Sequence, residues 1–323
     1  MLSRLRRALR RGPDTSGLSL IERHRRVEGE RLAAALTGQD DAPFRAAIQP
    51  VVKGDVQLWD DAHAAIQWTA QALEEQPEVV DRWLARSSDD PAPLLVRAVL
   101  HRIQAWEARD TDRDQFYDSL ERASIDAERA ADLAPENPLP LSVLTTIRLG
   151  DLDDLDGVRS AFEACIDRDP LNLDAHRIML FAMGETWYGS NDQMLGFARD
   201  AVAGAPAGSS LHELCPHAHF IRFKRESDHD HDEALANVMR AASISEITDA
   251  YGRLGGGERT SSELSLAAAL NRFAWHFYMA DADARATEAF GRIGPHVLRE
   301  PWDLLGDDAL DVFATARAAC AEA

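Results

Sequence analysis

The sequence predicts an all-α protein built from stacked helical hairpins, and three observations support this prediction. Residue types that favour helices, chiefly Ala, Leu, Glu and Arg, are abundant along the 323 residues. No alternating strand pattern with a tight hairpin turn is convincing. The prolines mostly stand between helical stretches, where they end helices, and some of them recur at a regular spacing.

The regular spacing of proline marks a repeat in the middle of the chain. Pro135, Pro170 and Pro206 follow one another after 35 and then 36 residues, and each closes an amphipathic segment. A helix, a short polar or glycine-containing break and a second helix follow the first two prolines. The helix pairs predicted in this way are 141–149 with 158–167, and 173–183 with 191–203. Pairs at this period bury each other's apolar faces, which predicts a stack of hairpins.

This repeat resembles the tetratricopeptide repeat (TPR), which has a period of ~34 residues and a closing proline. Counting back from Pro170, the large apolar position of the second helix falls on Phe162 and a small position on Cys165. The match is partial, because Thr146 stands where the first helix usually has glycine and Val158 where the second has alanine. The resemblance implies a TPR-like α/α helical-hairpin solenoid, but these departures mean that no TPR peptide-binding residues are carried over.

The same pattern organises the rest of the chain. We expect a basic N-terminal segment, 1–38, followed by one TPR-like helical-repeat domain, 39–323. A capping box of Thr260 and Glu263 is expected to open a late helix after the triple glycine. The further helices are expected at 55–74, 77–86, 93–109, 116–133, 233–242, 260–279, 284–293 and 308–321.

A second resemblance rests on a longer phrase. Its residues are Trp187-Tyr188-Gly189-Ser190, Met194-Leu195 and Phe197-Ala198-Arg199, supported by Trp106-Glu107-Ala108-Arg109, Leu211-His212 and Ala218-His219. Over residues 83–225 the chain is similar to a family of bacterial, actinobacterial-type, all-helical proteins that carry a W-x-G-S…M-L-x-F-A-R phrase. That family has no assigned activity, so this resemblance implies the fold and adds no chemistry.

The net charge of −20 is unevenly distributed. Residues 1–31 hold nine arginines and four acids, a net charge of +5, which leaves −25 for the remainder. An acidic body repels phosphate backbones, so we expect no nucleic-acid binding by the main domain. The arginine-rich leader, residues 1–11, has leucines at helical spacing and is an alternative contact for an acidic surface or anionic lipid.

The chain carries no signal for export or membrane insertion. No apolar run reaches the ~18 residues of a transmembrane helix, and the N-terminus lacks the apolar stretch of a secretory signal. Cys165, Cys215 and Cys320 are widely spaced and form no C-x-x-C pair, which fits a reducing compartment. We therefore expect a cytoplasmic protein. Lysine occurs only at Lys53 and Lys224, and this preference for arginine is typical of a GC-rich bacterial genome.

The best candidate for a metal site is the segment HELCPHAH, from His212 to His219. It resembles the H-E-x-x-H zinc motif but has Pro216 where the second histidine should stand. His212 and His217 lie ~140° apart around a helix, and His212 and His219 ~10 Å apart along it, too far for two bonds of ~2 Å. Cys215 can join either end, but two ligands would still be missing. We favour the alternative, a helix whose histidines bond to their neighbours.

Three other segments carry ligand-type or aromatic residues. Residues 228–232, DHDHD, can bind metal weakly, but a loop whose acids favour the next helix N-terminus is the simpler interpretation. Residues 150–157 resemble a calcium loop, but a leucine holds the first ligand position and an inter-helix turn explains the segment. Trp187 and Tyr188 can line a recognition surface, or Trp187 packs against a hairpin while the following serine caps a helix.

The functional prediction rests on the fold and on missing motifs. The sequence contains no G-x-S-x-G, no phosphate-binding G-x-x-x-x-G-K-[ST] and no dinucleotide fingerprint after a strand. We therefore expect a non-catalytic scaffold that binds a protein or peptide partner, with no metal and no cofactor. The alternative is a metal-dependent enzyme or metal-binding protein that uses the His212–His219 segment with an acid from elsewhere. The predicted binding residues are Trp187, Tyr188, Arg199, His212, His219 and Arg222.

Overall fold

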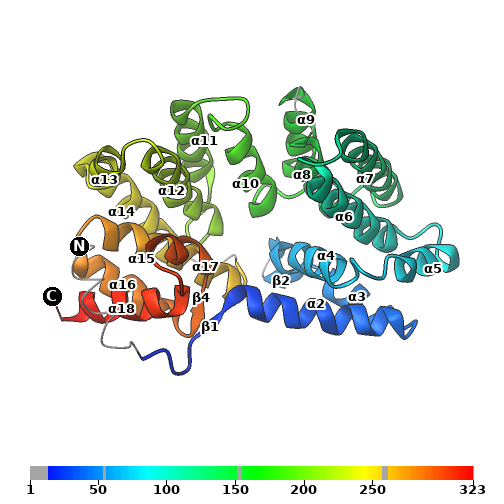
Figure 1. Ribbon diagram of the computed structural model, residues 1–323, viewed down its shortest axis with the longest axis horizontal. Coiled ribbons are helices and arrows are strands. Elements are labelled where there is room, and N and C mark those ends of the chain that lie inside the picture. The colour runs from blue at the N-terminus through cyan, green and yellow to red at the C-terminus, as the bar shows by residue number, and fades with distance from the viewer. Residues whose placement is uncertain (1–13, 54–55, 151–154, 257–260, 323) are drawn as a thin grey trace. The chain divides into compact units, whose positions relative to one another are not determined.

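The computed structural model describes residues 14–53, 56–150, 155–256 and 261–322, and it confirms the all-α class (Figure 1). The chain divides into two units, Arg25–Ser190 (the 25–190 unit) and Met1–His24 with Asn191–Ala323 (the terminal unit). Helix α2 (Ile21–Thr37) begins in the terminal unit and continues in the 25–190 unit. The expected domain boundary after residue 38 falls just past α2, inside the 25–190 unit.

Helices of the 25–190 unit pack pairwise along the chain. After α2 come α3 (Ala42–Ala47), β2 (Val51–Lys53), β3 (Val56–Leu58), α4 (Asp60–Ala72), α5 (Glu78–Arg86), α6 (Pro91–Ala108), α7 (Arg113–Leu133), α8 (Leu139–Arg148), α9 (Leu155–Ile166) and α10 (Leu173–Ala182). Helix α6 packs on α7, α7 on α8, α8 on α9 and α9 on α10. The alternate helices α4, α6, α8 and α10 also contact one another, so they share an interior.

The helices of this unit begin where side chains can satisfy their free N–H groups. Asp90 accepts a hydrogen bond from the Ala92 N–H at the start of α6, and Asp112 caps α7 in the same manner. Asn172 caps α10 by accepting from the Ala175 N–H at 3.0 Å. These caps fix the three starts to within three residues of the expected positions, because a short polar side chain before an apolar run is a local signal.

Small buried residues let the helices of the 25–190 unit approach closely. The alanines in the α6–α7 contact that are fully shielded from solvent are Ala98, Ala105, Ala123, Ala127 and Ala130. The contact between α2 and α4 is tighter still. A Cβ atom on Gly29 would lie 2.7 Å from the Trp68 Cβ and overlap the Trp68 carbonyl group, so only glycine fits there.

The terminal unit surrounds one long apolar helix. Its elements are β1 (Ser19–Leu20), α11 (Asn191–Gly204), the 3₁₀ helix η1 (Ser210–Glu213), α12 (Leu214–Ser227), α13 (His231–Val238), α14 (Ala241–Gly255), α15 (Glu263–Met279), α16 (Asp283–Ile293), β4 (His296–Val297), α17 (Arg299–Trp302), η2 (Asp303–Leu305) and α18 (Ala309–Ala321). Helix α15 is buried along most of its length, including Phe273, Trp275 and Phe277. Strands β1 and β4 pair in parallel, Ser19 opposite His296.

The structure contains a small hairpin that the sequence did not reveal. Strands β2 and β3 pair antiparallel, with Val51 opposite Leu58 and Val52 opposite Gln57. Each strand has only three residues, which is too short to show a period of two. The hairpin does not change the fold class, because all four strands in the described residues are this short or shorter.

Two helix boundaries differ from those expected in the terminal unit. The expected helix 233–242 is two helices, because Arg240 adopts an extended backbone (ψ 134°) between α13 and α14. The Ser243 hydroxyl then donates to the Asn237 carbonyl at 3.0 Å and satisfies the end of α13. At the start of α15, Ser262 is the cap and accepts from the Ser265 N–H at 3.2 Å, whereas the expected cap, Thr260, lies outside the described residues.

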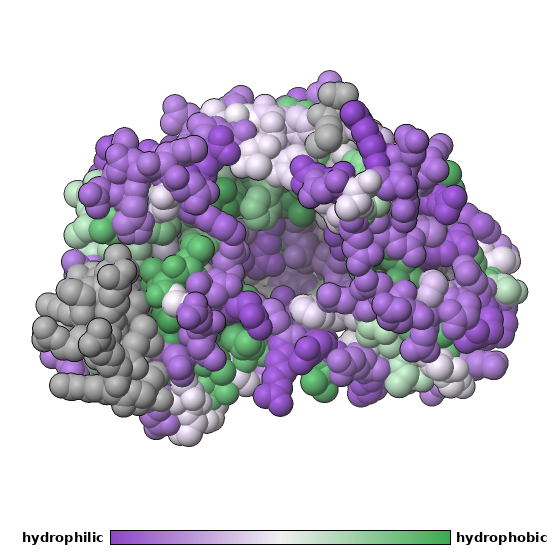
Figure 2. Space-filling view, viewed as in Figure 1, coloured by the Kyte–Doolittle hydropathy of each residue, from purple (hydrophilic) through white to green (hydrophobic). Residues whose placement is uncertain are grey.

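The visible surface is mainly hydrophilic. Figure 2 shows charged and polar residues over most of the face, with apolar residues only in patches. No helix among the described residues is long and apolar enough to cross a membrane.

We expect the Gly29→Ala substitution to destabilise the protein. The new methyl group meets the Trp68 backbone, which cannot rotate away, so α2 must shift, at a cost of about 1–3 kcal/mol. Thermal or urea unfolding measures this effect. Gly252→Ala on α14 is the matched control: its Cβ has open space, so alanine should stabilise that helix by about 1 kcal/mol. A Gly29→Ala protein as stable as wild type would contradict the close approach of α2 and α4.

Candidate functional site

A chain of hydrogen bonds crosses the interior of the 25–190 unit. The Arg102 guanidinium on α6 donates to the Gln67 Oε1 atom on α4 at 2.6 Å, and the Gln67 amide donates to the His63 Nε2 atom at 3.4 Å. His63 Nδ1 lies 3.1 Å from the Ser142 hydroxyl on α8, which donates to the Asn172 Oδ1 atom at 3.2 Å. Because Gln67 donates, His63 Nε2 must accept, which places the histidine proton on Nδ1.

The surroundings of His63 in this hydrogen-bond chain keep its imidazole neutral. Burial lowers its pKa, and the positive charges of Arg102, Arg177 and Arg25 lower it further, while Asp174 opposes them. Three arginines from three helices, α2, α6 and α10, therefore act on one buried imidazole. Arg177 has a carboxylate partner, since its Nη1 atom lies 3.2 Å from Asp174.

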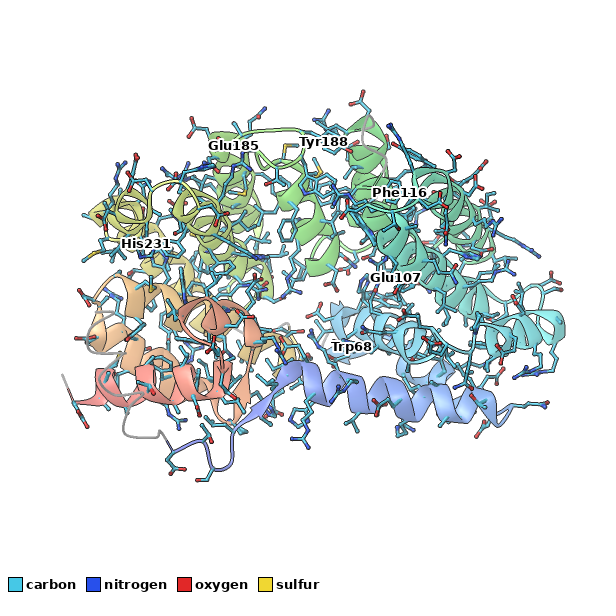
Figure 3. The ribbon with its side chains drawn as sticks, in the orientation of Figure 1. Trp68, Glu107, Phe116, Glu185, Tyr188 and His231 are labelled. Carbon is cyan, nitrogen blue, oxygen red and sulfur yellow. The ribbon has the colours of Figure 1, made fainter. Side chains whose placement is uncertain are left out.

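The other two arginines lack such a partner among the described residues. No carboxylate pairs with Arg25 or with Arg102, and the buried Nε–H groups of both have no hydrogen-bond acceptor. Burial lowers the pKa of Arg102 to about 10, so the side chain remains charged at neutral pH. Figure 3 labels Trp68 on α4 and Glu107 on α6, which mark the two helices that carry Gln67 and Arg102.

Trp187 and Tyr188 belong to an aromatic group at the edge of the same unit. The Trp187 ring meets the Trp106 ring edge to face at 6.0 Å, and the Trp106 ring meets Phe116 at 5.9 Å. The Arg109 guanidinium lies 5.0 Å from the Trp106 ring and 5.6 Å from the Trp187 ring. Trp187 thus packs against the α6–α7 hairpin; Phe116 and Tyr188 locate the group in Figure 3.

The HELCPHAH segment starts a helix rather than breaking one. His212 lies in η1, and its Nε2 atom bonds to the Pro206 carbonyl oxygen at 2.9 Å. Pro216 sits in the first turn of α12, where a missing N–H costs nothing, so the helix continues past it. His212 therefore points away from the histidines of α12.

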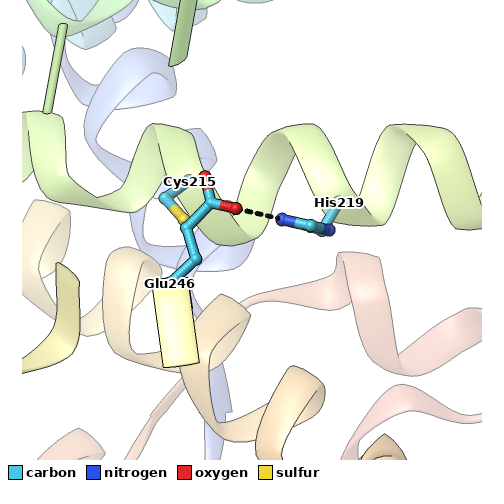
Figure 4. A group of neighbouring side chains, drawn as sticks. All are labelled: Cys215, His219 and Glu246. Carbon is cyan, nitrogen blue, oxygen red and sulfur yellow. Dashed lines mark hydrogen bonds and ion pairs between the residues drawn. The ribbon is translucent and has the colours of Figure 1, made fainter. Parts of the chain in front are cut away.

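Cys215, His219 and Glu246 come together in the terminal unit (Figure 4). Cys215 and His219 lie one turn apart on α12, and Glu246 reaches them from α14. One ligand-type atom of each residue lies within 4.8 Å of the others. The direct contact is between the His219 Nε2 and Glu246 Oε2 atoms, at 3.4 Å.

Electrostatics hold Glu246 charged and Cys215 protonated. Burial by itself raises the pKa of Glu246, but His219 and Arg199 outweigh it and lower the pKa to about 2. The Arg199 Nε atom donates to Glu246 at 2.9 Å. Burial, and then the negative charge of Glu246, raise the pKa of the Cys215 thiol well above its ordinary value.

His276 on α15 faces this cluster. Its ring lies 5.7 Å from the His219 ring, it is fully buried, and neither of its nitrogens has a hydrogen-bond partner among the described residues. Burial and the charge of His219 lower its pKa well below the ordinary value, against the effect of Glu246. Arg222, one of the expected binding residues, donates instead to Glu226 one turn later on α12, at 2.6 Å.

The structure describes only some of the remaining segments that the sequence offered as candidate sites. Asp230 caps α13 by accepting from the N–H groups of Asp232 and Glu233, as expected for acids before a helix. In the calcium-like loop, residues 151–154 lie outside the described residues. Residues 1–11 of the arginine-rich leader also lie outside them.

Arg25, Arg102, Glu246 and His276 are among the residues of these two clusters that the sequence did not indicate as candidates. The sequence could have indicated Arg102, because it is a charged residue within the largely apolar helix PAPLLVRAVLHRIQAW. Glu246 and His276 had none, because only tertiary packing brings α14 and α15 to α12. No family model matches the chain, and no curated protein matches it significantly. The geometry of the two clusters is therefore the basis for a functional assignment.

We expect the free energy of unfolding to fall as the pH drops from 7 to 5. Burial lowers the pKa of His63 and of His176, so both are neutral when folded but take up a proton on unfolding below their ordinary value of 6.5. Each such histidine contributes a slope of up to about 1.4 kcal/mol per pH unit. Urea unfolding at several pH values measures it.

His63→Gln should flatten this pH dependence, because one fewer proton is taken up on unfolding. The matched control is His229→Gln, which removes an exposed histidine and should leave the slope unchanged. Equal slopes for wild type and His63→Gln would contradict a neutral His63.

Proposed function

We propose that this protein is a non-catalytic, TPR-like helical scaffold whose 25–190 unit binds an acidic peptide or protein segment. The observation that carries this proposal is the pair of partly buried arginines, Arg25 and Arg102, whose buried Nε–H groups have no acceptor. A buried guanidinium N–H group without an acceptor is costly, so a carboxylate of a ligand would be favoured at this position, although Asp174 already acts on Arg25 at longer range.

A second arginine on α6 has a carboxylate partner within this unit and serves as a comparison for Arg102. Arg97 donates two hydrogen bonds of 2.7 Å to Asp126 of α7, whose side chain is only 6% exposed. Arg102 lies five residues later on the same helix and has a glutamine in place of an acid. The difference between these two arginines supports an anion from outside the unit as the partner of Arg102.

The surroundings of Arg102 favour binding over proton transfer. The hydrogen-bond chain holds Gln67 and His63 in fixed orientations, which fixes Arg102 Nη2 as well. His63 is kept neutral and buried, and its Nδ1 atom is bonded to Ser142, so it has no free position for a substrate proton. Pre-orientation of this kind lowers the entropy cost of binding a carboxylate.

The helix pairing supports the scaffold itself. Alternate helices of the 25–190 unit share an interior while their partners cover the outside, which is the arrangement of a TPR-like stack. We further propose that the protein acts in a bacterial cytoplasm, because its three cysteines are buried and form no disulfide in the described residues. The net charge of −20 disfavours the dense negative charge of a nucleic-acid backbone, and the proposed attraction for a carboxylate is confined to Arg25 and Arg102.

The test is a selection from a random peptide library on the purified full chain, followed by fluorescence anisotropy with the selected peptides. We expect enrichment of Asp and Glu, and an affinity that falls with added salt. Arg102→Gln and Arg25→Gln should each weaken binding about 10-fold or more, since a charged hydrogen bond contributes about 1.5–3 kcal/mol.

Arg82→Gln is the matched control for the lost charge. Arg82 lies on α5, is half exposed, and its Nη1 atom lies 4.0 Å from Glu78, so its removal should leave peptide affinity unchanged. Selected peptides without acidic residues, or full affinity in the Arg102→Gln protein, would contradict the proposal.

A further inference from the structure

The second cluster of ligand-type side chains lies in the terminal unit, where three helices meet. Cys215 and His219 are four residues apart on α12, so both side chains lie on one face. Glu246 on α14 completes a set whose sulfur, nitrogen and oxygen atoms lie within 4.8 Å of one another. Sulfur, imidazole and carboxylate are the three ligand types that zinc takes in proteins.

The separation of the imidazole and carboxylate atoms is compatible with a metal ion as well as with a direct hydrogen bond. The His219 Nε2 and Glu246 Oε2 atoms are 3.4 Å apart, at the long limit for a hydrogen bond between an imidazole and a carboxylate. Two zinc ligands with bonds of about 2.0 Å and a tetrahedral angle stand about 3.3 Å apart. The two side chains thus already have the separation of neighbouring ligands.

His276 is an independent observation at the same place. It is fully buried on α15, its ring is 5.7 Å from the His219 ring, and both of its nitrogens lack a partner among the described residues. A buried imidazole without any hydrogen bond costs free energy unless something bonds to it. An ion at Cys215, His219 and Glu246, or the water bound to that ion, would supply the missing partner.

Access and charge are compatible with an ion. Cys215 and His219 are buried, but the Glu246 side chain is 24% exposed, so an ion can reach the cluster past the carboxylate. Arg199 carries the nearest opposing charge and is itself 54% exposed, so solvent screens it. Arg199 donates to both carboxylate oxygens of Glu246, from Nε to Oε1 at 2.9 Å and from Nη2 to Oε2 at 3.2 Å, and so holds the carboxylate beside His219.

We propose that Cys215, His219 and Glu246 bind a divalent transition-metal ion of the zinc class, with His276 lining the site. The ion crosslinks α12 and α14 beside the buried helix α15. His212 is not a ligand, because its Nε2 atom bonds to the Pro206 carbonyl oxygen on η1. This site is separate from the arginines of the 25–190 unit, so either proposal stands if the other fails.

The test uses the purified full chain, stripped of metal and titrated with Co²⁺ alone. We expect one equivalent to bind, with the absorption of a cobalt–thiolate bond in the near ultraviolet and the visible bands of a four-coordinate ion. Added Zn²⁺ should displace the cobalt and raise the melting temperature, because an ion that binds only the folded state stabilises it.

Variants assign the ligands. Cys215→Ser should abolish the cobalt–thiolate absorption, and Glu246→Gln, at a partly exposed position, should weaken Co²⁺ binding about 100-fold without unfolding the protein. His276→Gln should change the visible bands and leave the thiolate absorption in place. Circular dichroism of each metal-free variant confirms that it is folded.

His229→Gln is the matched control, because it removes an exposed histidine from the DHDHD loop on the same unit. Its Co²⁺ affinity and spectrum should equal those of the wild type. The proposal is overturned if the wild type binds no stoichiometric metal, if binding survives Cys215→Ser and Glu246→Gln unchanged, or if His229→Gln removes it.

Discussion

Close packing of helices at small residues is the constraint on which both units depend. The helices of this chain are amphipathic and mostly short, and short helices are not stable alone in water. In the α6–α7 contact the shielded residues include five alanines, and around α15 the buried Ala267, Ala268, Ala269 and Ala274 have the same effect. Small side chains bring backbones together and leave the large apolar residues to fill the spaces between layers. A packed interior of this kind leaves little freedom for polar groups.

The polar groups that do enter the interior fall into two kinds. Arg97 and Asp126 satisfy each other completely, and Ser142 joins His63 to the cap of α10. Such groups stabilise the fold without any ligand. Arg25, Arg102 and His276 are different, because buried nitrogen atoms on each have no partner among the described residues. In a well-packed interior, incomplete bonding of this kind is the clearest indication of a site that something else completes.

The fold was largely predictable from the sequence, and the sites were not. Helix 158–167 was expected and α9 spans Leu155–Ile166, because a period of 3.6 residues is a local property of the sequence. The β2–β3 hairpin was missed because three-residue strands have no measurable period. The break between α13 and α14 was missed because no proline or glycine marks it.

The two clusters illustrate why sites are harder to predict than helices. Cys215 and His219 were candidates because they are one helical turn apart, but the expected third member was His212, whose Nε2 atom bonds to a backbone carbonyl from the 3₁₀ turn. Glu246 lies 27 residues after His219 and meets it only because α14 packs on α12. Arg25 and Arg102 are separated by 77 residues of the chain. Each convergence depends on the angles between helices, which no local pattern encodes.

The position of Arg25 on α2 has a consequence for the dynamics of the chain. Within the 25–190 unit, α2 contributes Leu32, Ala33 and Leu36 to the apolar core, and Gly29 packs against Trp68 of α4, so these few groups hold this helix in place. A carboxylate bound by Arg25 and Arg102 together would fasten α2 to α6 through the ligand. Binding of the ligand would then slow amide hydrogen exchange along α2, including at turns that do not contact the ligand.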